Sequence, residues 1–391
     1  MKIVSVTPIV CDAGWRPWIF VKITASDGTI GYGECSDNRS PHAVLGALED
    51  FRELIVGRDP RHIEMLYWDM YRATIHSVGG VVQKAIAGIN CALLDLQAKS
   101  LNVPVFQLFG GPTRDYIRVY WTHLGSYRIQ HGAHLGTPTI RSVKDIAELA
   151  ELAKSQGFNC VKTNAIDVFA SPPKVISQGF GGAGGSTDRL ATSAMIRSLN
   201  ALLGTLRDSV GDELDIAIDL NFNFTPEGVI RIAEALEPHN LAWVEVDSFD
   251  PQVLKEIKDT TRMPICSGEA LYTTGGYRPF FERRAMDIAM VDIPWNGFSM
   301  ARKIADMAEA YDINICPHNY YSHLATHIAA HLCAIVPNVQ YMELEVEDVP
   351  WKDEIVSRVP EIKAGHLKVP TAPGWGLELN EKEIAKHPWS R

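Results

Sequence analysis

The chain has 391 residues, a formal net charge of −10, and 46% hydrophobic and 21% charged residues. These fractions lie near the globular average, so the composition excludes a disordered or fibrous protein. The acidic balance and the lack of a long Lys/Arg run argue against a nucleic-acid partner. The length allows one large α/β barrel with an appendage, or two to three smaller domains.

The N-terminal residues lack the basic start and unbroken apolar run of a signal peptide, and no apolar segment approaches the roughly 18 residues of a membrane span. The seven cysteines are odd in number, scattered and without a CxxC pair. We therefore expect a cytoplasmic protein without a membrane partner, whose cysteines are buried as small hydrophobic side chains.

The pattern of strands and helices expected over residues 1–117 predicts an α+β capping domain. Strands are expected at KIVSVTPIVC, WIFVKITA and IGYGEC, with the turn SDGT between the last two. Apolar residues at three-and-four spacing predict helices over 42–57 and 81–102.

From residue 118 onward, short apolar strands alternate with helical stretches. Eight strands are expected, at RVYWTH, CVKTNA, DIAIDLN, AWVEVD, PICSGE, DIAMVD, INICPHN and YMELE. This alternation predicts a parallel sheet, and eight strands fit a closed TIM-type barrel over 118–352. We interpret the Gly/Ser-rich stretch 179–188 as a mobile loop at the barrel mouth. Residues 353–391 are expected to form a C-terminal segment that packs back on the cap.

Ionisable residues occur where these strands end, at Lys162, Asp219, Glu245, Glu269, Asp292, His318 and Glu343. From Asp219 onward they are 23 to 26 residues apart, which is one strand and one helix each time. Barrel active sites are assembled from such strand ends, so we expect these side chains to converge.

Asp219, Glu245 and Glu269 lie on three adjacent predicted strands. Three ionised carboxylates in one place repel one another unless a cation neutralises them. An all-oxygen set suits a hard divalent ion, Mg²⁺ before Mn²⁺ or Ca²⁺. The alternative is that each acid only caps the helix that follows it.

Asp292 and His318 lie on neighbouring predicted strands. A carboxylate that holds one ring nitrogen raises the basicity of the other, as in a general base or acid. The alternative is a core histidine with satisfied hydrogen bonds. A second set, His323, His327 and His331, repeats every four residues in a mostly apolar helix, and we interpret it as a packed helix face rather than a zinc site.

The motifs VKTN, IDLN, WVEV, SGE, MVD, PHN and MEL occur in this order, and PGWGLELNEKEIAKHPW closes the chain. The ordered set resembles the enolase superfamily, and within it the mandelate racemase-like group with its acid-sugar dehydratases. The resemblance covers nearly the whole chain. It implies an α+β cap over a modified (β/α)₇β barrel, and Mg²⁺-assisted removal of the proton α to a carboxylate.

The metal ligands implied by the resemblance are Asp219, Glu245 and Glu269, with one Mg²⁺ per subunit. It also implies that Asp292 and His318 form a catalytic dyad and that Glu343 hydrogen-bonds the substrate carboxylate. Lys162 matches the first lysine of the family's K-x-K pair. A metal and a cation are needed because an α-proton beside a carboxylate is very weakly acidic.

Asn164 departs from this pattern, since it stands where the racemases carry their second lysine, which acts as a base. Some dehydratases instead place a histidine two residues after the first metal ligand, and here that position is Asn221. We therefore expect a one-sided reaction in which His318, or alternatively Lys162, takes the α-proton and the β-hydroxyl leaves. Asn164 and Asn221 would bind sugar hydroxyls, or only bond the backbone at strand ends.

The first functional hypothesis is thus an acid-sugar dehydratase, acting on an aldonate or aldarate to give a 2-keto-3-deoxy sugar acid, and forming a homo-oligomer. The alternatives are an epimerase, racemase or cycloisomerase that uses Lys162 and His318, and a barrel that binds metal and ligand without turnover. In the cap, Arg16 lies in a loop with which the family selects substrate, and His76 is a weaker candidate. The alternative for Arg16 is a surface side chain packed on Trp15 or Trp18.

Overall fold

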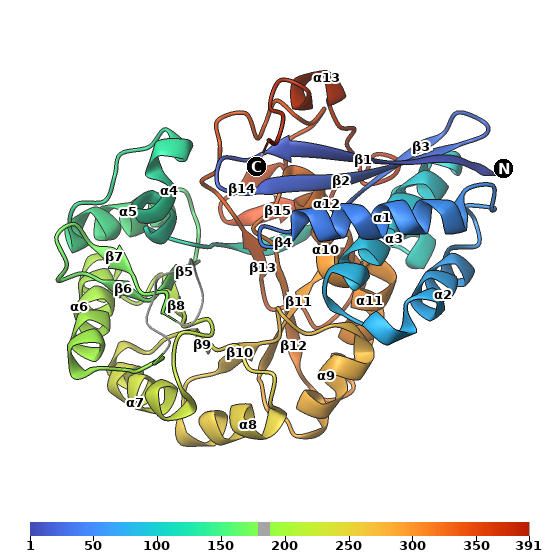
Figure 1. The fold of residues 1–391 in the computed structure, drawn as a ribbon. Coiled ribbons are helices and arrows are strands. Elements are labelled where there is room, and N and C mark those ends of the chain that lie inside the picture. Colours follow the sequence, from blue (N-terminus) through green and yellow to red (C-terminus); the bar gives the residue numbers. More distant parts are fainter. Residues whose placement is uncertain (179–187, 391) are drawn as a thin grey trace.

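The computed structural model describes residues 1–178 and 188–390. All eight predicted barrel strands are present (Figure 1). In chain order they are β4 (Tyr116–Trp121), β5 (Cys160–Asn164), β8 (Asp215–Asp219), β9 (Trp243–Glu245), β10 (Ile265–Ser267), β11 (Ile288–Asp292), β12 (Asn314–His318) and β13 (Met342–Leu344). The ladders that join them are parallel, which confirms the predicted TIM-type architecture.

The ring of strands closes between β12 and β13. On one side, β13 pairs with β4. On the other, the amide of Ile315 in β12 donates to the carbonyl of Asn338 at 2.7 Å, and the amide of Gln340 donates to the carbonyl of Ile315 at 3.0 Å. These bonds attach β12 to the segment just before β13 and leave no open sheet edge between them.

A buried apolar cluster fills the inside of the ring. Its members are Tyr120, Cys160, Ala217, Trp243, Cys266, Ile288, Met290, Cys316 and Tyr341. Alternate residues of a strand share a face, so the next inward position after Cys160 is Lys162, after Ala217 is Asp219, and after Trp243 is Glu245. The strand period therefore carries these ionisable side chains to the carboxyl end of the barrel.

Helices cover the outside of the ring (Figure 1). They are α4 (Ser126–Leu135), α5 (Val143–Ser155), α6 (Ser193–Val210), α7 (Pro226–Leu236), α8 (Pro251–Thr260), α9 (Thr273–Glu282), α10 (Ile293–Asn296), α11 (Phe298–Glu309) and α12 (His323–Ile335). Several of them begin after a side chain that accepts a first-turn amide, which is the common N-cap arrangement. Examples of these caps are Thr192, Thr225, Asp250, Asp292 and Ser322.

The N-terminal cap pairs a three-stranded antiparallel sheet with helices. The strands are β1 (Ile3–Asp12), β2 (Pro17–Ala25) and β3 (Ile30–Glu34), and the helices are α1 (Pro41–Ile55), α2 (Ile63–Ala73) and α3 (Gly80–Ser100). Helix α2 was not among the predicted elements. Glycines in β3 let α3 approach closely, since a Cβ on Gly31 would lie 2.1 Å from the carbonyl of Ala92.

The C-terminal segment contacts both the barrel and the cap. Its strand β15 (His366–Lys368) pairs antiparallel with β4 and with β14 (Ile362–Lys363). The indole of Trp375 donates to the carbonyl of Tyr32 in the cap at 3.0 Å, and a short helix, α13 (Glu381–Ile384), follows. A small hairpin, β6 (Ile166–Asp167) with β7 (Lys174–Val175), extends from β5.

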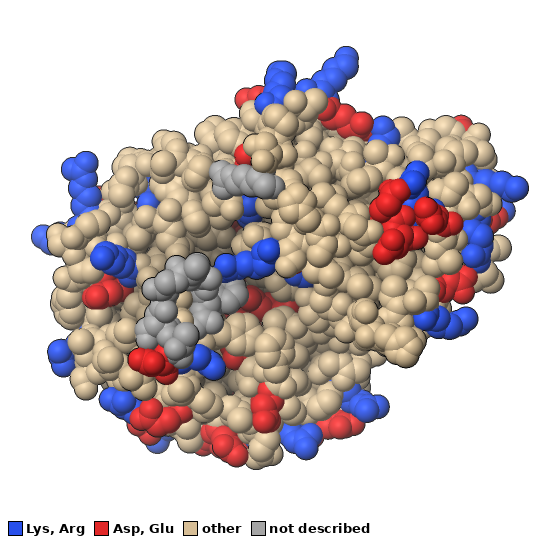
Figure 2. Space-filling view, in the orientation of Figure 1, with Lys and Arg blue, Asp and Glu red and all other residues tan. Residues whose placement is uncertain are grey.

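Within the described ranges, we find no helix of sufficient length and apolarity to cross a membrane. Figure 2 shows basic and acidic side chains interspersed over the visible face. All seven cysteines are free and buried, as predicted. The predicted Gly/Ser-rich loop over 179–188 lies outside the described residues, except for Asp188.

Candidate active site

A cavity of about 420 Å³ lies at the carboxyl ends of the barrel strands. Its lining includes the predicted site residues Lys162, Asn164, Asp219, Asn221, Glu269, His318 and Glu343. The cap closes the other side with Trp15, Asp37, Asn38, Arg39 and Lys84. Acidic side chains are visible inside a hollow near the middle of the face in Figure 2. Residues of the barrel and of the cap thus form the site together.

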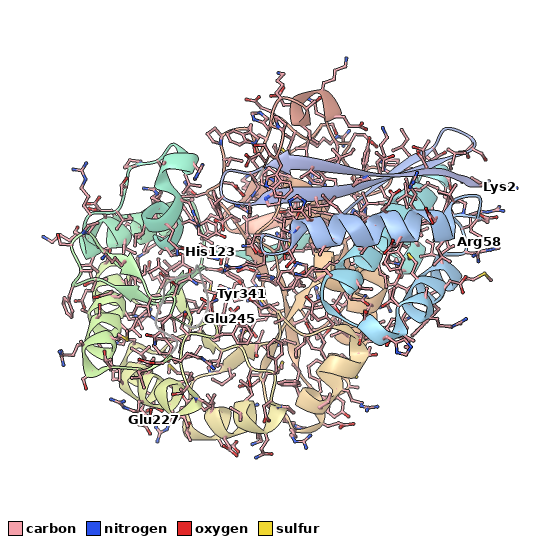
Figure 3. All side chains as sticks on the ribbon, in the orientation of Figure 1. Lys2, Arg58, His123, Glu227, Glu245 and Tyr341 are labelled. Carbon is pink, nitrogen blue, oxygen red and sulfur yellow. The ribbon has the colours of Figure 1, made fainter. Side chains whose placement is uncertain are left out.

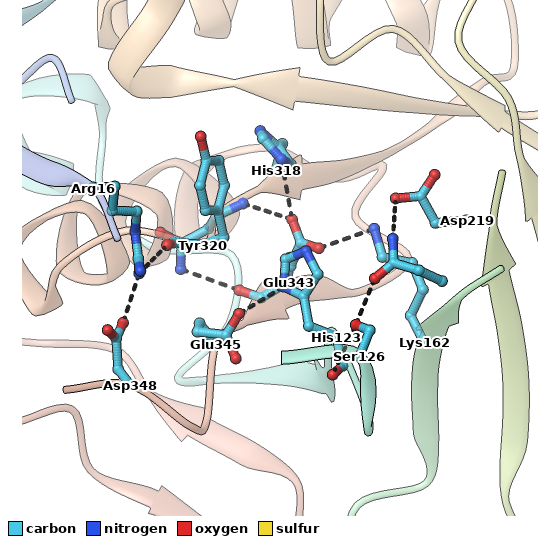
Figure 4. A network of polar contacts seen from close by, with 12 residues as sticks. Arg16, His123, Ser126, Lys162, Asp219, His318, Tyr320, Glu343, Glu345 and Asp348 are labelled. Carbon is cyan, nitrogen blue, oxygen red and sulfur yellow. Dashed lines mark hydrogen bonds and ion pairs between the residues drawn. The ribbon is translucent and has the colours of Figure 1, made fainter. Parts of the chain in front are cut away.

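Lys162 is buried inside the barrel between two carboxylates. Its Nζ lies 2.8 Å from Glu245 Oε2. The same nitrogen lies 2.9 Å from Glu343 Oε1 (Figure 4). Burial opposes the charge, but the negative charges of Glu245 and Glu343 outweigh it and hold the pKa of Lys162 well above its usual range. An apolar strand tolerates this ammonium group because ion pairs replace the lost water.

Asp219 and Glu245 face each other across neighbouring strands, as register partners of β8 and β9. Burial and repulsion from nearby carboxylates raise the pKa of Asp219 to about 6 and that of Glu245 to about 7. The attraction of Lys162 lowers both pKa values but does not outweigh these effects. Glu269 lies two residues beyond β10, and burial likewise raises its pKa. One oxygen of Glu245, Oε1, is buried without a hydrogen-bond partner.

These carboxylates have the chemistry of a Mg²⁺ site. Oxygen ligands on adjacent strands, raised pKa values and the unpartnered Glu245 Oε1 fit a hard cation that would restore full ionisation. Among the described residues, no three His, Cys, Asp or Glu side chains are drawn together closely enough to form a metal site as they stand. Asp219, Glu245 and Glu269 are the residues that would hold the ion.

Asn164 and Asn221, the two asparagines predicted to lie in the site, both hydrogen-bond the carboxylate of Asp219. Asn164 Nδ2 donates to Asp219 Oδ2 at 3.2 Å, and Asn221 Nδ2 donates to the same oxygen at 2.7 Å. The Asn164 carbonyl accepts a bond from the hydroxyl of Ser126 at 2.6 Å. Asn221 has a left-handed backbone, with φ of 47°, which asparagine tolerates. Both amides line the cavity, and both orient an expected metal ligand.

His318 and Asp292 are register partners on β12 and β11. His318 Nδ1 lies 2.7 Å from Asp292 Oδ2, and Asp292 Oδ1 accepts a bond from the amide of Trp295 at the start of α10. Asp292 therefore both caps a helix and orients the imidazole. Burial favours the neutral ring, but the negative charges of Glu269, Glu343 and Asp292 outweigh it and raise the pKa of His318 to about 10.

The structure does not bring Arg16 or His76 to the cavity. Arg16 Nη2 donates to Asp348 Oδ2 at 2.8 Å and to the carbonyl of Tyr320 at 2.9 Å. Its guanidinium stacks over the ring of Trp15, as the alternative interpretation expected, but it is buried rather than on the surface. His76 is exposed in a short 3₁₀ helix. Direct contact with substrate is therefore unsupported for both.

Other cavity residues were missed by the sequence analysis. The clearest is His123, which follows β4, lines the cavity and is labelled in Figure 3. Tyr320 and Trp295 add aromatic walls beside His318, with ring centroids 5.0 Å and 5.8 Å from it. His123 carried a usable signal, because it is the last residue of the predicted strand RVYWTH, as Glu269 is of PICSGE.

The histidine row of α12 is a packed helix face, as predicted. His327 Nδ1 donates to the carbonyl of Trp375 at 2.9 Å, and His331 Nδ1 accepts a bond from the amide of Phe106 at 3.1 Å. Both rings are buried. His323 instead pairs with Asp353.

Comparison with known proteins finds two family models that together span most of the chain. Residues 8–110 match the mandelate racemase / muconate lactonizing enzyme N-terminal domain, and residues 145–383 match the enolase C-terminal domain-like model.

Individual relatives align over nearly the full length. A D-xylonate dehydratase from Haloferax volcanii is 30% identical, over 99% of this chain and 89% of its own. A D-galactonate dehydratase family member from Streptomyces bingchenggensis is 28% identical, over 99% and 93%. A crystal structure from Burkholderia xenovorans, provisionally assigned as an L-alanine-DL-glutamate epimerase, superposes with a TM-score of 0.97 at 38% identity, over 99% and 98%. A second structure of that protein, with magnesium and fumarate bound, has a TM-score of 0.96 and 38% identity, over 99% and 96%.

Proposed function

The chain belongs to the mandelate racemase / muconate lactonizing enzyme family of the enolase superfamily, and from its site we propose that it is a Mg²⁺-dependent acid-sugar dehydratase. The observation that carries the proposal is the asymmetry of the cavity. One wall presents the His318–Asp292 dyad, whereas Lys162 is held as an ammonium ion between two carboxylates and Asn164 replaces the second lysine.

The chain's own residues divide the work as follows. The neutral form of His318, whose Nε2 lies 3.2 Å from Glu269 Oε2, accepts the proton α to the substrate carboxylate at Nε2, while Asp292 holds the ring by Nδ1. Glu343, held by the amide of Asn319 and the ammonium of Lys162, hydrogen-bonds the substrate carboxylate in its protonated form. Lys162 places positive charge beside the oxygens that become more negative. Asp219, Glu245 and Glu269 would hold Mg²⁺, which when bound would supply further positive charge to the substrate carboxylate.

Removal of the α-proton is followed by loss of the β-hydroxyl as water. The resulting enol becomes a 2-keto-3-deoxy acid. The two curated relatives described above are named as acid-sugar dehydratases, which supports hydro-lyase activity on an aldonate or aldarate.

The second candidate is an epimerase or cycloisomerase. The observation in its favour is the 38% identity to a protein provisionally assigned as an epimerase. Two-base epimerisation needs a neutral base on the face opposite His318. Lys162 has no free lone pair while it is bound to Glu245 and Glu343, and an asparagine amide takes no proton, so dehydration is the better match.

The test is a screen of aldonates and aldarates with Mg²⁺, read by detection of 2-keto acids. For each acid that reacts, proton NMR in D₂O distinguishes the two candidates. A dehydratase consumes the substrate as the α-proton signal disappears, whereas an epimerase exchanges the proton and conserves composition. If no acid sugar gives a 2-keto acid and the α-proton only exchanges with deuterium, the isomerase hypothesis replaces the dehydratase hypothesis.

The proposal includes three further expectations. The enzyme binds one Mg²⁺ per subunit, as atomic absorption of the purified protein would measure. It works in the reducing cytoplasm, in keeping with seven free, buried cysteines. It assembles as a homo-oligomer, which sedimentation analysis would test.

A further inference from the structure

A second imidazole–carboxylate pair faces the cavity, and no step described above uses it. His123 Nδ1 lies 2.6 Å from Glu345 Oε2 (Figure 4). The contact follows from the register of β4 and β13, in which Trp121 is opposite Leu344. The residues just beyond this pair therefore leave the barrel side by side.

The pair is built so that one ring nitrogen remains for the cavity. Glu345 is fully enclosed, with 1% of its side chain exposed, whereas 15% of the His123 side chain is exposed. The ring is stacked on Tyr127, with centroids 3.9 Å apart and planes 8° apart. Since Nδ1 is bound to Glu345 and no protein partner is assigned to Nε2 among the described residues, Nε2 is free to meet a substrate.

The surroundings favour a pair that carries two protons, one between Nδ1 and Oε2 and one on Nε2. Burial keeps the pKa of His123 well below its usual value, so the ring does not become an imidazolium on its own. Burial and the charge of Asp348 hold the pKa of Glu345 well above its usual value, so this carboxyl retains a proton. The charged groups around the pair are Arg16, Lys162, His318, Glu343, Asp348 and Lys352.

We propose that His123, supported by Glu345, is the catalytic acid that protonates the departing β-hydroxyl; this rests on the proposed dehydratase function. His318 Nε2 takes the α-proton, and the electron pair of that C–H bond forms the new double bond. The Cβ–O bond breaks, and its electron pair leaves with the oxygen. That oxygen takes the Nε2 proton of His123 and departs as water. The remaining proton settles on Nδ1, beside an ionised Glu345.

This assignment separates two tasks that a single histidine would otherwise perform in turn. Tyr320 lies beside both imidazoles, with ring centroids 5.0 Å from His318 and 6.2 Å from His123. The two rings are therefore held around one part of the cavity by a shared neighbour. Asn164 and Asn221 leave no other proton carrier where the family's second base usually stands.

The test compares proton exchange with elimination in His123→Asn. With the acid sugar found in the screen, we expect α-proton exchange in D₂O to persist while formation of the 2-keto acid falls about 10²-fold or more, the usual contribution of a general acid. The 3-deoxy-3-fluoro analogue needs no protonation at its leaving group. Fluoride release from it by His123→Asn should therefore stay within a few-fold of the wild-type rate.

Two companion variants make the result decisive. Glu345→Gln should reproduce the selective loss of water elimination, and it replaces His123→Asn if that variant fails to fold. His366→Asn, at a half-buried position on β15, is the matched control and should change neither rate. Equal losses of exchange, water elimination and fluoride release in both pair variants would assign the pair a structural role and overturn the proposal.

The outcomes also separate this inference from the proposed function. If the wild-type enzyme dehydrates and His123→Asn dehydrates equally fast, the dehydratase stands and the role of His123 is rejected. If the wild-type enzyme dehydrates no acid sugar, both are rejected.

Discussion

The ammonium group of Lys162 lies 2.8 Å from Glu245, an expected metal ligand, and the same nitrogen reaches Glu343 at 2.9 Å. One buried cation thus joins the metal end of the site to the carboxylate that faces the substrate. We therefore propose an electrostatic role for Lys162 rather than that of a base, because its ammonium group is paired with two negative groups.

Lys162→Met should lower kcat about 10²-fold or more, because the cation that stabilises the developing charge is lost. It should also destabilise the fold, since removal of one partner leaves buried carboxylates unpaired at a cost of about 3 kcal/mol or more. Steady-state kinetics at saturating Mg²⁺, with thermal unfolding of the same samples, measures both. Activity near the wild-type level in folded Lys162→Met would contradict the electrostatic role.

Binding of Mg²⁺ should stabilise the folded protein, and this effect should weaken in acid. Without the ion, Asp219 and Glu245 have pKa values of about 6 and about 7, so below pH 7 protons compete with the metal. At 100 times its Kd, the ion should add about 2.7 kcal/mol of stability near pH 8, and clearly less at pH 5.5. Thermal unfolding with Mg²⁺ and with chelator at both pH values provides the measurement.

Glu245→Gln is the matched variant for the metal experiment, because it keeps the size of the side chain and removes one charge. Its unfolding temperature should respond little to Mg²⁺. An unchanged response, or full activity of the wild type in excess chelator, would remove the metal from the mechanism.

Asn164→Ala should weaken metal binding as well as substrate binding, since its amide holds Asp219 Oδ2. Loss of such an outer partner typically costs about 10- to 100-fold in metal affinity. Isothermal titration with Mg²⁺ gives the metal affinity, and KM at saturating Mg²⁺ gives the effect on substrate. Unchanged metal affinity with a raised KM would restrict Asn164 to substrate hydroxyls, and Asn221→Ala offers the parallel test.

The buried histidines of α12 should make the fold acid-sensitive. Burial lowers the pKa of His327 to about 4 and that of His331 to about 3. Above pH 6.5 both rings are neutral whether the chain is folded or not, so they add no pH dependence. Below pH 6.5, these histidines bind protons in the unfolded chain but stay neutral in the folded protein. The free energy of unfolding therefore falls as the pH drops toward 4. His327 alone accounts for about 3 kcal/mol.

Chemical denaturation between pH 7 and pH 4 measures this slope, and His327→Gln should reduce it by up to one proton. His366→Gln, which alters a half-buried ring on β15, should leave this slope unchanged. An equal slope in all three proteins would place the acid sensitivity elsewhere.

The periodicity of the chain by itself determined the barrel and much of its site. A strand exposes alternate residues to one face, and each strand and helix unit returns the chain to the same end of the barrel. For that reason Asp219, Glu245, Asp292, His318 and Glu343 could be assigned to one region from spacing alone. The alternation of side chains along a strand and the length of a strand-helix unit are local properties of the chain. The structure follows both at these five positions.

Only the tertiary structure decided which distant groups meet. Arg16 is paired with Asp348, 332 residues away, and His123 with Glu345, 222 residues away. Whether a charged side chain is free for a ligand or neutralised by a partner depends on such contacts. They arise where the cap and the first and last barrel strands come together, and no spacing along the chain encodes them. The sequence therefore pointed to Arg16 for substrate binding, whereas the fold buries Arg16 and presents His123 to the cavity.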